Sequence, residues 1–225
     1  MKIGILQTGH AIDTLRREMG DYDAMFARLL DGHGFTFETW NVVDEDYPER
    51  PSQADGWLIT GSKHGAYEDH PWIPPLERFI RDIYAAGRPL VGVCFGHQII
   101  AQALGGKVVK FPGGWAIGRT VYDFEGQQIA LNAWHQDQVV TLPEGAQVVG
   151  SNAFCAHAAL LYGDRIYSVQ PHPEFGSYII GQLIEHRGPG VVPDAQLAQA
   201  QTRLDAPVGN DVIGRRIAEF FKQER

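Results

Sequence analysis

Residues 89–98 read Pro-Leu-Val-Gly-Val-Cys-Phe-Gly-His-Gln, and this stretch decides the fold. The apolar run over 89–93 is too short for a helix and predicts a buried strand. A helical pattern follows from about residue 96 to residue 104. Glycines two positions before and two positions after Cys94 permit the sharp turn that joins such a strand to such a helix. The stretch therefore predicts a reactive side chain at the carboxyl end of a buried strand.

The cysteine at this turn has two interpretations. A free cysteine is most often a small, buried hydrophobic residue. A thiol above a helix N-terminus, however, meets a partial positive charge that favours the thiolate. The backbone N–H of Phe95 would also point to the place where an oxyanion forms. The strand, the glycines and the helix together favour a nucleophile at Cys94, although the turn alone does not define the chemistry.

The segments on either side of this turn predict an α/β fold. Short apolar runs, such as residues 2–7 and 56–60, alternate with amphipathic helical patterns, of which one is capped by Asp21. This alternation is typical of βαβ units. We therefore expect a central, mostly parallel sheet flanked by helices, in the three layers of a flavodoxin-like fold.

The second half of the chain has a different texture. After Gly106 come short strand-like runs, among them 107–111, 118–124, 128–131 and 138–142, with few helical signals. They predict a small antiparallel β element beside the main sheet. Two helical patterns in the tail predict a C-terminal helical extension. No linker is visible, so we expect one domain over residues 1–225, with a core of about 1–186 and a helical tail over 187–225.

A second motif supplies the proton-transfer groups that a thiolate nucleophile needs. Residues 170–174 read Gln-Pro-His-Pro-Glu, and each residue before a proline is driven toward extended backbone. Because positions i and i+2 of an extended run share a face, His172 and Glu174 should point the same way. An isolated His-x-Glu is more often a solvated surface pair. Downstream of the Cys94 turn, between a strand pattern and a helical pattern, it predicts a cysteine-based active site.

Together these motifs resemble the class I glutamine amidotransferase domain, whose catalytic triad is Cys-His-Glu. Residues 92–98 are similar to its nucleophile signature, and residues 170–175, Gln-Pro-His-Pro-Glu-Phe, to its His/Glu signature. Residues 58–62 lie where the family places its oxyanion-hole glycine, and residues 134–137 lie where it has a loop beside the substrate. The resemblance covers roughly residues 1–186 in order and spacing.

The resemblance implies a role for each of five residues. Cys94 attacks the γ-carboxamide of glutamine, and the backbone amides of Gly61 and Phe95 hold the oxyanion. His172 passes a proton to the departing ammonia and then activates water against the γ-glutamyl thioester, while Glu174 orients His172. No cofactor is implied.

The resemblance also implies a substrate-binding set and shows two departures. Gln98 and the backbone around His135 would hold the α-amino and α-carboxylate ends of the substrate. Phe95 stands where the family usually has leucine, which preserves the role because only its N–H is needed. Residues 60–63, Thr-Gly-Ser-Lys, replace the more usual Gly-Gly-Pro or Asn-Gly-Pro.

Composition and charge exclude several kinds of partner. The chain has 225 residues, 44% of them hydrophobic, and a formal charge of −8 from 19 Lys and Arg against 27 Asp and Glu. Nucleic-acid binding needs a basic face, so no nucleic-acid partner is expected. No apolar stretch reaches the ~18–20 residues that span a bilayer, and the first residues do not resemble a secretory signal. Two cysteines make no disulfide framework, so we expect a cytoplasmic protein without membrane contact.

Other polar residues receive weaker interpretations. Residues 63–70 contain the ingredients of a metal site, but a flexible loop rarely holds converging ligands, so we predict no metal. The long loop over 61–75 is better interpreted as a lid over the thiolate. Lys63 and Arg119 are candidate partners for a substrate carboxylate, although solvated surface positions are the simpler interpretation. His97 and Cys155 are expected to pack in the core.

Three functions compete on these observations. The first is a glutaminase of the amidotransferase type, with the ammonia released or passed to a separately encoded synthase or ligase. The second is a γ-glutamyl peptidase or hydrolase with the same triad and a roomier pocket. The third is an inactive subunit that regulates a partner, but an inactive copy has no physical need of all three catalytic groups. Another α/β family with a cysteine turn is disfavoured by the His172-x-Glu174 arrangement.

Overall fold

The computed structural model describes residues 1–225 and is built on a seven-stranded sheet. Its strand order is β2-β1-β3-β4-β11-β10-β9. The strands are β1 (Lys2–Leu6), β2 (Thr36–Trp40), β3 (Gly56–Ile59), β4 (Leu90–Val93), β9 (Gln147–Gly150), β10 (Ala159–Tyr162) and β11 (Ile166–Val169).

The first five strands of that order are parallel. β1 pairs with β2 and β3, and β4 pairs with β3 and β11, while β10 and β9 extend the sheet in antiparallel fashion. Every residue of β3, β4 and β11 is buried, as expected for strands that are covered on both faces. The predicted central, mostly parallel sheet of flavodoxin-like order is confirmed.

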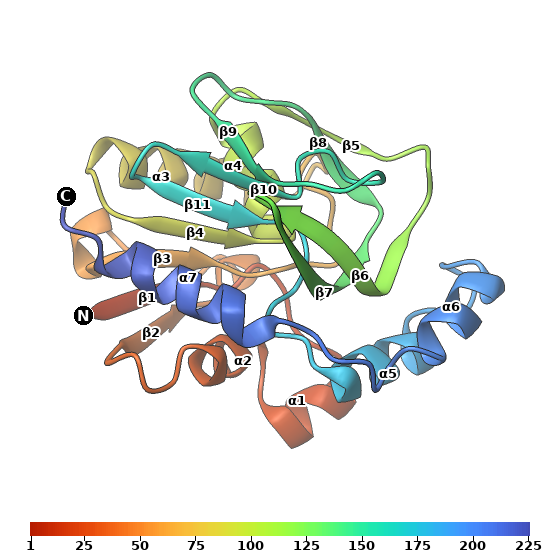
Figure 1. Cartoon of the computed structure of the whole chain (residues 1–225). Helices are drawn as coiled ribbons and strands as arrows, with labels where there is room; N and C mark the ends of the chain where they lie inside the picture. The colour runs from red at the N-terminus through yellow and green to blue at the C-terminus, as the bar shows by residue number, and fades with distance from the viewer.

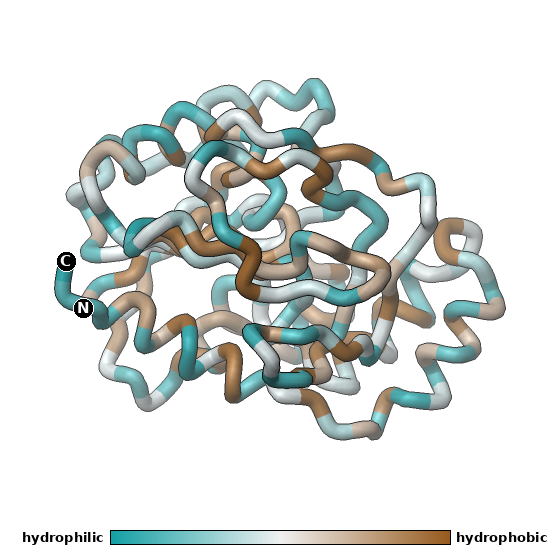
Figure 2. Tube along the Cα trace, turned by 45° about the horizontal axis from the view of Figure 1, so that its top comes forward, coloured by the Kyte–Doolittle hydropathy of each residue, from teal (hydrophilic) through white to brown (hydrophobic).

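Helices cover both faces of this sheet. They are α1 (Asp13–Met19), α2 (Tyr22–Leu29), α3 (Ile73–Ala85), α4 (Phe95–Ala103), α5 (Ser177–His186), α6 (Asp194–Gln201) and α7 (Asn210–Lys222), with short 3-10 turns at Val42–Asp44 and Pro51–Gln53. α3 and α4 share one core cluster with Trp57 of the sheet, and α2 and α7 share the other with Ile3. Figure 1 shows α7 lying along the sheet near β1 and β3. Hydrophilic and hydrophobic residues alternate along much of the chain (Figure 2). α2, α3, α4 and α7 bury their apolar residues against the sheet, whereas α1 packs on α5 and α6 lies beside α5.

Two small antiparallel pairs lie beside the main sheet. β5 (Lys107–Lys110) pairs with β8 (Asp137–Thr141), and β6 (Ala116–Phe124) pairs with β7 (Gln127–His135). They confirm the predicted antiparallel element. The prediction ended the β7 strand at residue 131, but the ladder with β6 continues until Ala116 stands opposite His135. Tertiary pairing extends this strand beyond its local apolar pattern.

The tail and the N-terminal region complete the fold. α6 and α7 correspond to the two helical patterns of the tail, and Ile213, Ile217 and Phe221 of α7 are buried against the sheet. α1 was not predicted, because Leu15 is its only buried residue and leaves no apolar stripe to recognise. No helix combines the length and the apolar character that crossing a bilayer requires.

Candidate active site

The carboxyl ends of three neighbouring parallel strands bring the predicted site residues together. β3 leads into Gly61, β4 leads into Cys94, and β11 leads into the segment that carries His172. β4 lies between the other two strands and pairs with both. Residues that are far apart in the sequence therefore meet at one edge of the sheet, where ligands of open α/β folds bind.

Cys94 occupies a strained turn between β4 and α4. Its φ is 55° and its ψ is −105°, a positive-φ conformation that residues with side chains rarely adopt. A Cβ on Gly92 would stand 2.6 Å from the carbonyl oxygen of Gly96, and a Cβ on Gly96 would stand 2.3 Å from that of Ile59. Both glycines are needed because backbone passes this close, and the predicted strand-to-helix turn is present.

His172 lies between Glu174 and Cys94. Its Nδ1 is 2.7 Å from Oε1 of Glu174, and the two side chains are only 5% and 0% exposed. The imidazole stacks on Phe175 with ring centroids 3.9 Å apart and an interplanar angle of 2°. Cys94 lies beside the same ring, since a Cβ on Gly61 would be within 2.9 Å of Cε1 of His172 and 3.6 Å of Cβ of Cys94. The stacking and the carboxylate fix the ring, so that one nitrogen meets Glu174 and the other is directed toward the sulfur.

The electrostatics of this group favour a charged imidazole. Burial acts to lower the pKa of His172, but the negative charges of Glu174 and Cys94 and their hydrogen bonds outweigh it and raise this pKa to about 10. Both neighbours are buried with it, so little solvent screens the interaction. A histidine in this setting holds a proton at neutral pH and can deliver it.

Two backbone N–H groups beside Cys94 have no acceptor in the protein. Phe95 is the first residue of α4, so its N–H has no partner within the helix. The N–H of Gly61 makes no hydrogen bond either. A Cβ at Gly61 would stand 2.9 Å from Cε1 of His172 and 3.6 Å from Cβ of Cys94, so position 61 must be glycine for these groups to approach. Both donors are therefore free for an acceptor bound beside Cys94.

Thr8, which the sequence analysis does not single out, orients the Gly61 amide. The carbonyl of Thr60 accepts hydrogen bonds from Oγ1 of Thr8 at 2.9 Å and from the N–H of Gly96 at 3.1 Å. Because the C=O and N–H of a trans peptide point in opposite directions, these bonds direct the Gly61 N–H away from them. Thr8 belongs to no motif, and its partner is 52 positions away, so no local pattern signals this contact.

Gln98 and His135 line the same pocket and are both buried. The Nε2 of Gln98 donates to the Asp137 carbonyl at 2.9 Å and to Oε1 of Gln170 at 3.1 Å, which leaves the Gln98 oxygen for a ligand. The Nδ1–H of His135 donates to the same Asp137 carbonyl at 3.2 Å, and its Nε2 has no partner. Burial lowers the pKa of His135 to about 3, so this residue offers a neutral acceptor nitrogen.

Two asparagines hold the segment that follows His172. The side chains of Asn132 and Asn210 both donate to the carbonyl of Phe175, at 2.8 Å and 2.9 Å, and the N–H of His172 donates to the carbonyl of Asn132 at 2.8 Å. Asn210 is the first residue of α7, so the tail contacts the segment that carries His172 directly. Asparagine near a helix N-terminus is common, and the sequence therefore carries no sign of this second function.

His97 and Cys155 lie in the core, as expected. His97 is fully buried beneath the turn, where its Nδ1 lies 2.8 Å from the hydroxyl of Ser168. Cys155 is 2% exposed and packs in the same apolar cluster as Cys94. Neither side chain reaches the pocket above Cys94.

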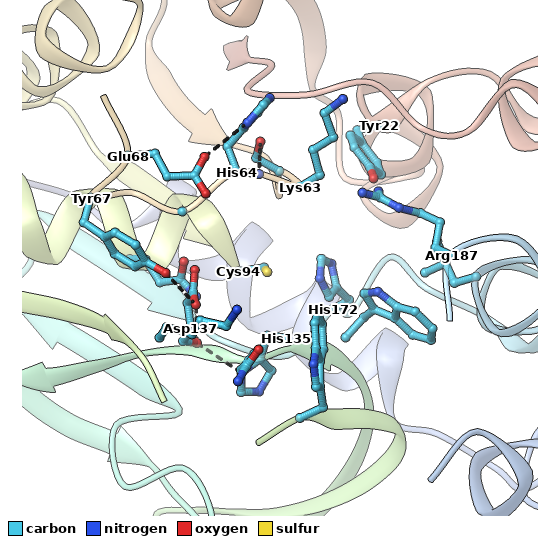
Figure 3. A pocket seen from close by; sticks show the side chains of 18 of the residues that line it. Tyr22, Lys63, His64, Tyr67, Glu68, Cys94, His135, Asp137, His172 and Arg187 are labelled. Carbon is cyan, nitrogen blue, oxygen red and sulfur yellow. Dashed lines mark hydrogen bonds and ion pairs between the residues drawn. The ribbon is translucent and has the colours of Figure 1, made fainter. Parts of the chain in front are cut away.

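A cavity of about 200 Å³ opens above Cys94. Figure 3 shows that its walls differ in character on the two sides of the sulfur. Tyr67 and Asp137 lie on one side, where the Tyr67 hydroxyl donates to the Asp137 carboxylate at 3.1 Å. The opposite side carries an aromatic hydroxyl and two cations, from Tyr22, Lys63 and Arg187. Glu68 and Lys110 also line the cavity and act on the charge of Asp137, so the first end keeps a net negative charge and the opposite end is basic.

The two candidate carboxylate partners have different positions. Lys63 lines the cavity, whereas Arg119 does not and instead donates to the carbonyl of Pro207 at 2.9 Å. Arg187, at the C-terminus of α5, was not identified from the sequence because it lies just beyond the region of the resemblance. Only the folded chain brings it to the site.

The loop over 61–75 forms part of the rim and gathers three metal-ligating side chains. His64 Nδ1 and His70 Nε2 lie 3.4 Å and 2.8 Å from the same Oε2 of Glu68, and the three ligand atoms are within 4.8 Å of one another. The argument that a flexible loop does not hold converging ligands is therefore wrong for this loop. The hydrogen bond between Glu68 and His70 is sufficient reason for the cluster, and the expected absence of a metal stays a prediction.

Known proteins share this sequence pattern. The chain matches the family model of glutamine amidotransferase class-I over residues 27–185. A glutamine amidotransferase-like protein of Schizosaccharomyces pombe is 31% identical, over 97% of this chain and 98% of that protein. Gamma-glutamyl peptidase 4 of Arabidopsis thaliana is 29% identical over 76% of this chain and 74% of its own. The glutamine-hydrolyzing GMP synthase of Clostridium acetobutylicum is 34% identical over 69% of this chain and 31% of its own.

The three-dimensional fold agrees with the sequence comparisons. The solved glutamine amidotransferase of Methylobacillus flagellatus superposes with a TM-score of 0.74 at 23% identity, over 98% of this chain and 91% of that one, and so shares its α/β fold. The match to the family model covers more than half of the chain. This chain belongs to the glutamine amidotransferase class-I family, whose members named above include enzymes.

Proposed function

We propose that this protein is a cysteine-dependent hydrolase of γ-glutamyl amide bonds that acts through a thioester at Cys94. One observation carries the proposal. Cys94, held at a strained turn, lines the same cavity as His172 and lies beside its imidazole, and Nδ1 of that imidazole is 2.7 Å from Glu174. A nucleophile, a proton carrier and an orienting carboxylate in this order are the requirements of covalent acyl transfer.

The first half-reaction forms the thioester. The Cys94 thiolate attacks the γ-carbonyl carbon, and the electron pair of the C=O bond moves to the oxygen. The N–H groups of Gly61 and Phe95 donate to that oxyanion. When the tetrahedral intermediate collapses, the C–N bond breaks and His172 gives its proton to the departing amine. The γ-glutamyl group then remains on the sulfur.

The second half-reaction releases glutamate. His172, now neutral, takes a proton from a water molecule, and the hydroxide formed attacks the thioester carbonyl. The C–S bond breaks, glutamate leaves and the thiolate–imidazolium pair is restored. Glu174 holds the ring and stabilises its charged form in each half-reaction.

The acidic end of the cavity suits the amino end of the glutamyl group. Gln98 presents a free carbonyl oxygen and His135 a neutral acceptor nitrogen. The carboxylates of Glu68 and Asp137 line the same region. An α-ammonium group bound there would meet acceptors on several sides, which supports the assignment of Gln98 and His135 to substrate binding.

Two kinds of substrate contain a γ-glutamyl amide bond. Glutamine would release ammonia, and the similarity to a GMP synthase supports its transfer to a synthase or ligase partner. A γ-glutamyl peptide would release an amino acid or peptide, and the similarity to an Arabidopsis γ-glutamyl peptidase supports that alternative. The aromatic walls from Trp115 and Trp134 also suit a leaving group larger than ammonia.

Removal of the sulfur tests the proposal. Purified protein and its Cys94→Ala variant are incubated with glutamine and with γ-glutamyl dipeptides, and glutamate release is measured. We expect a loss of at least about 10⁴-fold in kcat in the variant, since a covalent nucleophile is removed. Cys155→Ala, which removes the other buried cysteine, is the matched control and should keep its activity. Full activity of Cys94→Ala, or no γ-glutamyl mass on residue 94 after acid quenching of turnover, would refute the mechanism.

A further inference from the structure

Two cations share the basic end of the cavity although they come from distant parts of the chain. Lys63 lies in the loop after β3, and Arg187 follows the last residue of α5. In Figure 3 their side chains and that of Tyr22 lie together, across Cys94 from Tyr67 and Asp137. Tyr22 and Arg187 line the same cavity as Cys94.

Neither cation has an anionic partner in the protein. The side chains of Lys63 and Arg187 form no ion pair, and neither donates a hydrogen bond. Arg187 is nevertheless half-buried. A partly desolvated guanidinium is expected to be paired, and its fork of donors matches a carboxylate. Its place at the C-terminus of α5 offers some compensation, but does not explain why the side chain is directed into the cavity.

Tyr22 adds a neutral donor to the two charges. Its side chain is 6% exposed and its hydroxyl makes no hydrogen bond in the protein. Burial raises the pKa of Tyr22, and the opposing effect of Arg187 is smaller. The hydroxyl therefore keeps its proton at physiological pH and can donate it to an anion. Two cations and one hydroxyl around one space are complementary to a carboxylate.

The position of this cluster distinguishes the two candidate substrates. The acidic end of the cavity suits the ammonium of the glutamyl group, and the cations lie on the other side of the sulfur that attacks the bond. Groups on that side face the leaving amine. Ammonia released from glutamine has no anionic group that could bind to these cations. The amino acid released from a γ-glutamyl dipeptide carries its own α-carboxylate, which could bind there.

We infer that Lys63, Arg187 and Tyr22 form a leaving-group carboxylate site, and that the substrates are γ-glutamyl peptides or conjugates whose leaving amine bears a free carboxylate. This inference rests on the proposed γ-glutamyl hydrolase function and names its substrate class. The site selects at the acyl-donor step and takes no part in bond breaking. Lys63 and Arg187 are thus specificity-determining residues.

The test compares an acid with its amide. Wild type, Arg187→Gln and Lys63→Gln are assayed with γ-glutamylalanine, γ-glutamylalanine amide and glutamine. We expect wild type to prefer the acid over the amide by about 10- to 100-fold in kcat/KM, since hydrogen bonds to charged groups contribute about 1.5–3 kcal/mol. Each variant should lose most of this preference through KM while it keeps its turnover of the amide.

Arg28→Gln, which removes an exposed arginine remote from the cavity, is the matched control. Added salt should reduce the preference of wild type in part, because Lys63 is exposed to solvent and Arg187 only half-buried.

Binding separates this inference from the catalytic proposal. Calorimetry on Cys94→Ala and on Cys94→Ala/Arg187→Gln measures affinity for the acid and the amide without turnover. Tighter binding of the acid by Cys94→Ala alone supports the site even if hydrolysis has another mechanism. Equal binding of acid and amide by Cys94→Ala overturns it. So does an equal loss on all three substrates in Arg187→Gln, which would assign the cation to the α-carboxylate of the glutamyl group.

Discussion

The proposed catalytic row (Cys94, His172 and Glu174) and the rim of the cavity (Lys63 and Arg187) differ in burial and in how they are held. Cys94, His172 and Glu174 are at least nine-tenths buried, and each is fixed by a strand end and by its neighbours. Lys63, in the loop after β3, is exposed, and Arg187 is half-buried with no partner in the protein. The row is thus held in one arrangement, as the proposed bond breaking requires, whereas the rim keeps unpaired charges that a ligand can meet. Substitutions in the row should affect all substrates alike, and substitutions at the rim should change the choice among them.

The largest effect that bears on this comparison is expected for Glu174→Gln. The amide keeps the shape of the side chain but removes the charge that orients and stabilises the imidazolium, so kcat/KM should fall by about 10²- to 10⁴-fold. Glutamine and γ-glutamylalanine should lose equally, as measured by glutamate release. A loss confined to one of them would mean that Glu174 also contributes to substrate choice, and the division between row and rim would fail.

A similar but smaller loss is expected for Gly61→Ala. The new methyl group would stand 2.9 Å from Cε1 of His172, so the imidazole or the oxyanion loop must shift. Loss of one oxyanion donor typically reduces kcat by about 10²- to 10³-fold. Gly176→Ala is the matched control, because Gly176 has an ordinary φ of −88° and open space around it. If Gly61→Ala kept full kcat, the Gly61 amide would not serve the oxyanion.

The pH dependence should report the buried imidazolium. Because Glu174 and Cys94 raise the pKa of His172 to about 10, kcat/KM should fall tenfold per pH unit above about 10 rather than above its ordinary value of 6.5. Stability follows the same proton. The contribution of His172⁺ is fully present below pH 6.5 and is lost as the pH rises through about 10. Denaturant unfolding of wild type and His172→Gln at pH 6, 8 and 10 checks this. A difference between them that grows with pH would contradict it.

The smallest effect on activity is expected for Asn210, through which α7 contacts the segment that follows His172. Asn210→Ala removes one of the two donors to the Phe175 carbonyl, and Asn132 retains the other. The free energy of unfolding should fall by about 1 kcal/mol, and kcat/KM by a few-fold at most. Asn210→Asp keeps a favourable residue at the start of α7 but cannot donate. The two variants should therefore match in activity and differ in stability; a match in stability as well would assign the whole effect to helix α7.

The sequence predicts those parts of the molecule that depend on local pattern. Glycines at 92 and 96 mark the turn at Cys94, and prolines at 171 and 173 make His172 and Glu174 share a face. The apolar runs of the parallel strands are recognisable for the same reason, because strands buried on both faces need continuous apolar residues. Each of these signals lies within a few residues of the group that it positions.

The rest depends on contacts between distant segments. Thr8 orients the loop that carries Gly61 from 52 positions away, and Asn210 binds the carbonyl of Phe175 across 35 positions. Arg187 follows a helix as any surface arginine would, and only the fold turns it into the cavity. Local periodicity signals neither the far end of β7, which depends on pairing with β6, nor the short α1, which buries only Leu15.

The positive φ of Cys94 has a consequence for how this protein balances robustness against reactivity. A backbone in that conformation holds on the order of 1–3 kcal/mol of strain, which glycine at the same position would largely relieve. Stability alone would therefore disfavour a thiol at residue 94, and the buried parallel strands around it must supply the compensating free energy. Engineering that raises the melting temperature by relaxing this turn should lower the reactivity of the sulfur in the same step.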